Sequence, residues 1–146
     1  MVVRISGTVS SGLGRAQVFM SQNHYQSQFK RVLGVGAWPG TLNVEVDGVS
    51  ADFFRQLRII AGLESGDSVE STEPHRIDGF ERDGKSFGGA TAFCARISRE
   101  GGVWEGCAVL IPDLTRHTST AEIISGSFLR EALPCSDGDL VRIELN

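Results

Sequence analysis

Residues 87–112, FGGATAFCARISREGGVWEGCAVLIP, give the clearest evidence of fold class in the chain. Two apolar runs flank the EGG turn at 100–102, and short apolar runs joined by a glycine turn are typical of a β-hairpin. HRIDGFER at 75–82 leads into the first of these runs through a DGKS turn at 83–86, which indicates another hairpin. We therefore expect an antiparallel sheet over the second half of the chain, with LVRIEL at 140–145 as its last strand.

Strand patterns also occur in the first half of the chain. Residues 2–9 (VVRISGTV) are rich in β-branched side chains and predict a strand, and residues 17–21 (QVFMS) look like a shorter one. TLNVEV at 41–46 alternates strictly, so its apolar residues share one face of a strand and its polar residues the other.

Two helices are predicted among these strands. The first follows an apolar stripe at helical spacing and ends near Gly34, and the second covers residues 51–61, with Ser50 as a possible N-cap. The stripes consist of Tyr25, Phe29, Val32 and Leu33 in the first helix and of Phe53, Leu57, Ile60 and Ala61 in the second.

The sum of these elements predicts a mainly β protein. We expect an antiparallel sheet closed as a barrel, with two or three short helices packed outside it, in a single domain over residues 1–146. Residues 63–74 (LESGDSVESTEP) are polar and acidic, so we expect them to form a surface loop.

The composition is ordinary for a soluble globular protein and disfavours several functions. A formal charge of −4 argues against nucleic acid as a partner, because binding phosphates over a broad surface requires clustered Lys and Arg. No apolar stretch approaches the roughly 18 residues of a membrane span. Cys94, Cys107 and Cys135 are odd in number and widely spaced, which favours free thiols in a reducing compartment, with the cytoplasm as the expected location.

SSGLGRA at 10–16 follows the first predicted strand. A glycine-rich turn in this place lets backbone N–H groups converge on an anion, because no Cβ blocks a close approach. Arg15 would add a charge-assisted contact to a phosphate. Taken alone, the segment favours a plain hairpin turn, since it is neither a Walker loop nor a GxGxxG fingerprint.

PGTLN at 39–43 leads into the strictly alternating strand. The alternation places the Thr41 hydroxyl and the Asn43 amide side by side on the polar face. Two neutral oxygens, completed by water and a nucleotide phosphate, suit Mg²⁺. A turn before a strand whose polar face meets solvent explains the same spacing equally well.

TRHTST at 115–120 offers hydroxyls and one imidazole just before Glu122. Such a segment can bind a phosphate or a polyhydroxylated ligand, although its composition favours an exposed loop. His117 has no partner at the spacing of a nucleophilic triad or a zinc site, so we do not expect it to act in either. His24 and His75 are expected to be ordinary surface or helix-start residues.

FLRE at 128–131, preceded by Ser127, reads as the start of a helix. The free N–H groups of such a helix start, together with Arg130, could meet a phosphate or the edge of a base. A short amphipathic helix with its apolar side chains inward is the alternative, and it is favoured when the segment is taken alone.

The order of these segments resembles the CTP-dependent riboflavin kinases known chiefly from archaea. The resemblance runs from about Gly7 to Ile143 and includes the glycine loop, the helix with Tyr25 and the DGKS hairpin. Its most specific parts are PGTLNV at 39–44 and the series EII…LRE.L…DGD.V over 122–141.

The resemblance implies a six-stranded cradle-loop barrel that phosphorylates riboflavin to FMN, with CTP as donor and a divalent cation such as Mg²⁺. It implies that Thr41 and Asn43 ligate the cation and that Thr115 and Glu122 contact the flavin. Glu122 is also the candidate catalytic base for the ribityl hydroxyl. The nucleotide-binding residues that it implies are Gly12, Leu13, Gly14, Arg15, Ala16, Gln17, Ser127, Phe128, Leu129 and Arg130.

Three segments depart from the family pattern. The glycine loop reads GLGRA where the family usually has GLGEG, which leaves other nucleoside triphosphates open beside CTP. Thr115 lies about one residue too close to Glu122, so Thr118 is the alternative flavin contact. The acidic loop at 63–74 is longer than expected.

Trp38 and some of the eight Phe residues could line a site for the isoalloxazine ring, although Phe is more often core.

Three functions are compatible with the sequence, and we give them in order of preference. The first is a riboflavin kinase, whose partners are the small molecules riboflavin and a nucleotide, without nucleic acid or membrane. The second is a barrel of the same fold that binds a flavin or a nucleotide without turnover. The third is a scaffold that binds other proteins.

Overall fold

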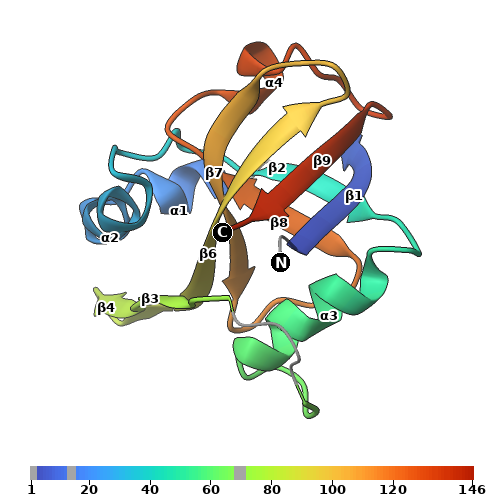
Figure 1. Ribbon diagram of the computed structural model, residues 1–146. Coiled ribbons are helices and arrows are strands. Elements are labelled where there is room, and N and C mark those ends of the chain that lie inside the picture. Colours follow the sequence, from blue (N-terminus) through green and yellow to red (C-terminus); the bar gives the residue numbers. More distant parts are fainter. Residues whose placement is uncertain (1–2, 13–15, 68–71) are drawn as a thin grey trace.

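Six antiparallel strands close into a barrel in the computed structural model, which describes residues 3–12, 16–67 and 72–146 (Figure 1). The strands are β1 (Val3–Ser10), β2 (Leu42–Val46), β6 (Ala90–Arg99), β7 (Trp104–Pro112), β8 (Thr120–Ile124) and β9 (Leu140–Leu145). They follow one another in the order β6-β7-β8-β2-β1-β9, and β9 pairs with β6 to complete the ring. The closed barrel and the mainly β fold are therefore confirmed.

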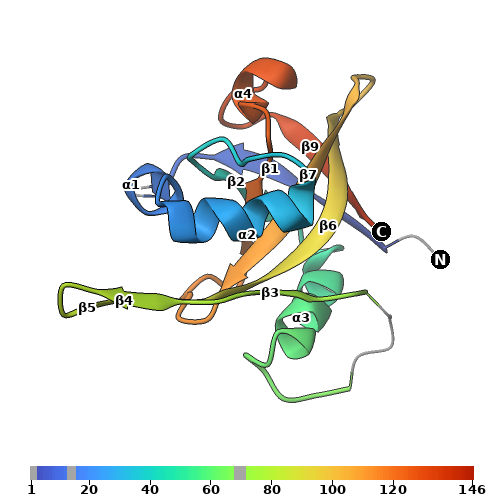
Figure 2. The same ribbon diagram turned by 90° about the vertical axis from the view of Figure 1, so that its left-hand side faces the viewer.

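The remaining elements lie outside this ring. β3 (His75–Ile77) pairs with β6, while β4 (Phe80–Arg82) and β5 (Lys85–Phe87) form a hairpin that projects from the barrel (Figure 2). The helices of the described residues are α1 (Ala16–Met20), α2 (Asn23–Leu33), α3 (Ala51–Ile60) and α4 (Leu129–Ala132). α1 and α2 lie together on one side of the barrel, and α3 and α4 lie at other places around it (Figures 1 and 2).

The barrel interior is an apolar core that follows the alternation of the strands. Leu42 and Val44 of β2 point inward, and so do Ala121 and Ile123 of β8. Phe93 of β6 is completely buried among them. Burial of these side chains supplies the main driving force for closing the sheet.

A second core lies outside the barrel, between α1 and α2 and the outer face of β6, β7 and β8. Tyr25 and Phe29 of α2 belong to this outer core together with Leu110 and Ile124 of the sheet. Because these strands are covered on both faces, β7 carries the continuous apolar run at 108–111 rather than an alternating pattern.

The predicted helix from Tyr25 to Gly34 is confirmed as α2. It ends at Gly34, whose φ of 80° lies in the left-handed region that glycine adopts without strain. The N–H of Gly34 donates to the Lys30 carbonyl, which closes the last turn.

Two local predictions are wrong. Residues 17–20 belong to the short helix α1, and Ser21 lies in the turn after it, so the segment is not a strand. Both edges of β1 are already paired, with β2 and β9, and the segment instead buries Met20 in the outer core. Ser50 precedes α3, but its hydroxyl does not cap the helix and instead accepts a hydrogen bond from the Ser6 N–H at 2.9 Å.

An ion-pair network crosses the strands at the point where β1, β9 and β6 meet. Glu144 of β9 is almost fully buried and accepts from Arg4 at 2.8 Å and from Arg96 at 2.5 Å. Arg96 also lies 4.3 Å from the centre of the Trp104 ring. Hydrogen bonding to Arg96 lowers the pKa of Glu144.

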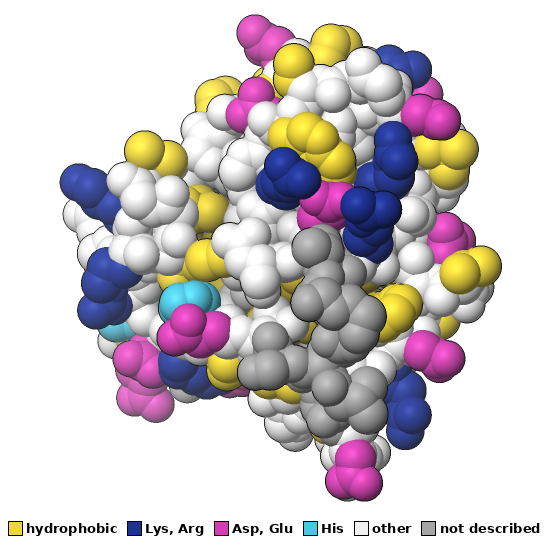
Figure 3. Space-filling view, viewed as in Figure 1, with side chains coloured by type: hydrophobic (Ala, Val, Ile, Leu, Met, Phe, Trp, Pro, Cys, Tyr) yellow, Lys and Arg dark blue, Asp and Glu magenta, His cyan; other side chains and the backbone are white. Residues whose placement is uncertain are grey.

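On the face of the molecule shown in Figure 3, basic and acidic side chains are mixed rather than gathered into patches of one charge.

In the described part of the chain, no helix combines the length and the apolar character that a membrane crossing requires.

Replacing Phe93 by Ala tests the importance of the barrel interior. We expect the free energy of unfolding to fall by about 3–5 kcal/mol, because the substitution leaves a cavity in a completely buried site. Urea unfolding followed by circular dichroism measures the change. The matched control is Val49→Ala, at a side chain that is 89% exposed, and a similar effect of both substitutions would contradict the assignment of the core.

Candidate functional site

One row of paired residues crosses the outer face of the barrel and changes from polar to apolar along its length. Ser10 lies opposite Asn43, and Asn43 lies opposite Glu122. Glu122 in turn lies opposite Leu110, which pairs with Ala92. Directly opposed side chains of an antiparallel pair point to the same side of the sheet. The register therefore places Glu122 at a boundary, with polar groups on one side and the outer core on the other.

Two cavities lie on either side of this boundary. The first, which we call the polar chamber, has a volume of about 680 Å³, and the second, the apolar chamber, about 470 Å³. Both are within the size range of small-molecule sites. The polar chamber is lined by Ser10, Ser11, Gly12, Ala16, Gln17, Trp38, Pro39, Gly40, Thr41, Asn43, Glu45, His117, Thr120, Glu122, Phe128 and Arg130. The apolar chamber is lined by Ala16, Phe19, Met20, Tyr25, Phe29, Thr41, Ile77, Ser86, Phe87, Gly88, Gly89, Ala90, Leu110, Pro112, Leu114 and Glu122.

The two chambers share Ala16, Thr41 and Glu122. Thr41 and Glu122 therefore stand where a ligand in the polar chamber would meet a ligand in the apolar one. A pair of reactants held in this way is already oriented for reaction, which removes much of the entropic cost of a bimolecular step.

The two oxygens predicted to ligate a cation lie side by side in the polar chamber. The Thr41 hydroxyl is 3.2 Å from Asn43 Oδ1. Adjacent ligands of an octahedral Mg²⁺, each about 2.1 Å from the ion, lie about 3 Å apart. The pair therefore fits two positions of such an ion, with the others left to water and phosphate. The described residues contain no cluster of three or more His, Cys, Asp or Glu side chains arranged to hold a metal.

Gly12 lies directly against this pair. A Cβ atom at position 12 would stand 2.5 Å from Nδ2 of Asn43, so a larger residue would displace the amide. Glycine at position 12 therefore leaves the Asn43 amide in its place, a close approach that the sequence pattern alone does not reveal.

Glu122 is half-buried at the chamber boundary. Burial raises the pKa of its carboxyl group above the ordinary value, and the nearby His117 opposes this effect. A carboxylate with a raised pKa is a better proton acceptor than an exposed one, as general-base catalysis requires.

The loop that carries His117 is fixed by α3. Arg58 is buried, and its Nη1 donates to the His117 carbonyl at 2.5 Å while its Nε lies 2.8 Å from Glu64. The His117 N–H donates to the Thr115 hydroxyl at 3.1 Å. These contacts fix the backbone of the loop, and His117 lines the polar chamber, a placement that the sequence spacing did not suggest.

A hydrogen-bond network joins the glycine loop to the 127–130 segment. Nη2 of Arg130 donates to Asp137 at 2.8 Å and to the Ser10 carbonyl at 3.4 Å. The Ser11 hydroxyl also donates to Asp137, and this bond and the one from Arg130 lower the pKa of the carboxyl group. Asp137 thus connects two segments expected to bind one nucleotide, a role that the sequence did not assign to it.

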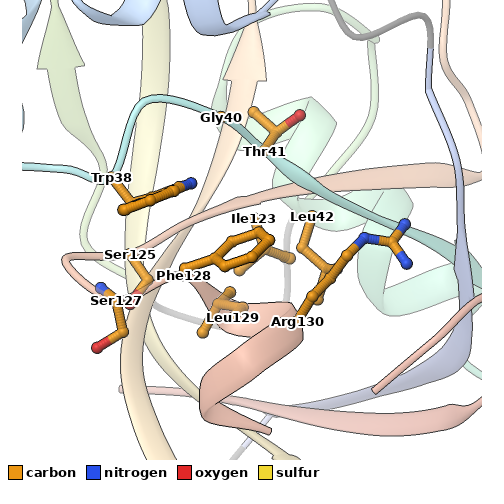
Figure 4. A pocket seen from close by; sticks show the side chains of 10 residues that line it. All are labelled: Trp38, Gly40, Thr41, Leu42, Ile123, Ser125, Ser127, Phe128, Leu129 and Arg130. Atoms are coloured by element: carbon orange, nitrogen blue, oxygen red, sulfur yellow. Dashed lines mark hydrogen bonds between the residues drawn. The ribbon is translucent and has the colours of Figure 1, made fainter. Parts of the chain in front are cut away.

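Most of the predicted site residues that the structure describes line the polar chamber or a smaller pocket beside it, but two predicted flavin contacts do not. Ser127 and Leu129 line a small pocket of about 60 Å³ beside the polar chamber, which Figure 4 shows. Thr115 lines none of the cavities described here, and its hydroxyl is occupied by the His117 N–H. Thr118, the alternative, is also absent from these linings. Leu13, Gly14 and Arg15 lie outside the described residues.

The apolar chamber is the part of the site that sequence reasoning located least well. Its aromatic walls come from α1, α2 and β5, with Phe19, Tyr25 and Phe87 as examples. The abundance of Phe was the only available signal. Trp38, considered for the flavin, lines the polar chamber instead.

The chain also matches a known protein family. A family model for CTP-dependent riboflavin kinases, described as "Domain of unknown function DUF120", matches residues 9–145. This chain belongs to the CTP-dependent riboflavin kinase family.

Curated archaeal relatives named "Riboflavin kinase" are similar to the chain over nearly its whole length. The protein of Thermoplasma acidophilum is 34% identical over 143 residues, that of Haloquadratum walsbyi 33% over 145, and that of Pyrobaculum islandicum 33% over 144. The matches cover 98%, 99% and 98% of this chain. They cover 57%, 57% and 60% of the relatives, so the chain spans little more than half of their length.

The raised pKa of Glu122 predicts a dependence of stability on pH. Because folding disfavours the charged carboxylate, the wild type is less stable above the folded pKa than a variant with a neutral side chain. Glu122→Gln should therefore raise the free energy of unfolding at pH 7–8, where the wild-type carboxyl is charged. The advantage should disappear as the pH falls through the folded pKa toward 4.

Urea unfolding at pH 4 to 8 measures this difference. Glu100→Gln, at an exposed turn between β6 and β7, is the control and should show no such pH-dependent gain. A wild type that remains the more stable protein at pH 8 would contradict the burial of the charge.

Proposed function

We propose that this chain catalyses the reaction for which its relatives are named, the phosphorylation of riboflavin to FMN. The γ-phosphoryl group of a nucleoside triphosphate is transferred to the terminal hydroxyl of the ribityl chain. The main support is the junction of the two chambers at Thr41 and Glu122. An apolar ring system and a charged nucleotide require different surroundings, and they must meet at the reacting atoms.

The apolar chamber suits the isoalloxazine ring. Ile77 is buried and Phe87 is half-buried in its lining, and burial of an aromatic ligand between such side chains is favourable. The ribityl chain then extends toward Thr41 and Glu122. Thr115 or Thr118 contributes to flavin binding only if the 113–119 loop rearranges, because neither lines the chamber.

The polar chamber suits the nucleotide. Gly12 and Arg130 line it, and backbone N–H groups of the glycine loop together with the guanidinium of Arg130 would donate to phosphate oxygens. Thr41 and Asn43 would hold Mg²⁺, which neutralises charge on the transferring phosphoryl group when it is bound. We propose CTP as the donor because of the family to which the chain belongs.

Glu122 accepts the proton of the attacking hydroxyl in this proposal. The ribityl oxygen forms a bond to the γ-phosphorus, and the bond from that phosphorus to the β-γ bridging oxygen breaks. The products are FMN and the nucleoside diphosphate, so the atoms balance without a further reactant. General-base assistance of this kind contributes about 10²–10⁴-fold to a rate.

The proposed partners are small molecules alone. The net charge of −4 does not favour nucleic acid. A reducing compartment such as the cytoplasm suits Cys94, Cys107 and Cys135, all of which are free thiols.

Chromatographic detection of FMN tests the proposal. Purified protein is incubated with riboflavin, Mg²⁺ and one of CTP, ATP, GTP or UTP, and we expect FMN with CTP. Asn43→Ala should lower the rate at least about 100-fold, because the cation site loses one of its two protein oxygens. Asn23→Ala removes an exposed amide outside the chambers and should leave the rate unchanged.

Two other results have clear meanings. FMN formation with ATP but not with CTP would support the kinase activity and would contradict CTP as the phosphate donor. No FMN with any donor, from folded protein that still binds riboflavin, would reject the kinase in favour of a flavin-binding module without turnover.

A further inference from the structure

Two large aromatic rings are exposed at one end of the polar chamber. Trp38 is 46% exposed and Phe128 is 41% exposed, and their ring centres lie 4.9 Å apart with the planes inclined by 22°. Figure 4 shows the indole next to the phenyl ring, with Arg130 of α4 on the other side of the ring of Phe128, which directly precedes that helix. We call these two rings the aromatic pair.

The backbone of the aromatic pair is held firmly although its rings are exposed. The Trp38 N–H donates to the Ser125 carbonyl at 2.7 Å, and the Ser125 hydroxyl donates to the Gly106 carbonyl at 2.7 Å. Ser125 itself is 3% exposed. Trp38 is therefore anchored through its backbone to a buried residue that directly follows β8.

The aromatic pair lies outside the apolar chamber. Trp38 and Phe128 line the polar chamber and the small pocket, and neither is part of the lining of the apolar chamber. They share the polar chamber with Gly12, Thr41 and Arg130, the groups that suit phosphates and a cation. A nucleotide whose phosphates lie at those groups would have its base within the same chamber.

We propose that the base of the donor nucleotide stacks on the aromatic pair and that Trp38 is the main determinant of this contact. The inference rests on the proposed function and deepens it, because it assigns Trp38 to the nucleotide rather than to the flavin. Stacking against a flat base removes exposed aromatic surface from water, and every base offers a π face for it. Stacking thus raises affinity for the nucleotide and leaves the choice among bases to other contacts.

Steady-state kinetics of Trp38→Ala tests the inference. We expect KM for CTP to rise at least about fivefold, the lower end of the loss when a base-stacking aromatic is truncated. KM for riboflavin and kcat at saturating CTP should stay within about twofold of the wild type. Trp38→Phe should restore most of the affinity for CTP, and Trp38→Leu should not, since only the former keeps an aromatic face. A rise in KM for riboflavin alone would overturn the assignment.

Tryptophan fluorescence gives a direct readout without turnover. The chain contains two Trp residues, so Trp104→Phe leaves Trp38 as the only indole. CDP added without riboflavin should change the Trp38 emission with a saturable dependence, and inorganic tripolyphosphate, which lacks a base, should not. Unchanged emission while calorimetry shows CDP bound would overturn the inference.

The two experiments separate this inference from the proposed function. FMN formation by the wild type with an unchanged KM for CTP in Trp38→Ala would reject the stacking role and keep the kinase. A saturable Trp38 response to CDP in a protein that forms no FMN would keep the stacking role and reject the kinase.

Discussion

The pairing of β2 with β8 in one register is the constraint on which the site depends. It sets Asn43 opposite Glu122 on the outer face of the barrel and turns Leu42, Val44, Ala121 and Ile123 into the core. A slip of one residue would move the polar pair into the interior and the apolar side chains toward solvent. The cost of burying those polar groups fixes the register, and the register in turn fixes the geometry of the site.

The same register divides the outer face of the barrel into a polar part and an apolar part. α1 and α2 cover the apolar part of the face, and the polar part is left beside the glycine loop and α4. The boundary falls at Glu122, whose carboxyl is buried enough for its pKa to rise. In the proposed mechanism the same carboxyl accepts a proton, so the burial that raises its pKa would serve catalysis at some cost in stability.

The features that could be predicted from the sequence are those that depend on the local pattern of apolar and polar residues. Strict alternation from 41 to 46 placed Thr41 and Asn43 on one face, and paired apolar runs predicted the barrel, which is confirmed. The short helix α1 was missed because Val18 and Phe19 are typical of strands, whereas the packing of Met20 decides the local structure.

The parts of the site that were missed depend on distant contacts. The link between Asp137 and Ser11 spans 126 positions, and the apolar chamber is assembled from segments between Ala16 and Glu122. Sequence cannot distinguish a Phe in the core from one in a cavity wall. The binding and catalytic roles of the site residues remain predictions.

A structure of the protein with riboflavin and CDP bound together would test the two-chamber account most directly. The account predicts the isoalloxazine ring in the apolar chamber beside Phe87 and the diphosphate in the polar chamber near Thr41 and Asn43. The terminal ribityl hydroxyl should lie within hydrogen-bonding distance of Glu122. A flavin ring bound in the polar chamber, or a ribityl chain directed away from Glu122, would contradict it.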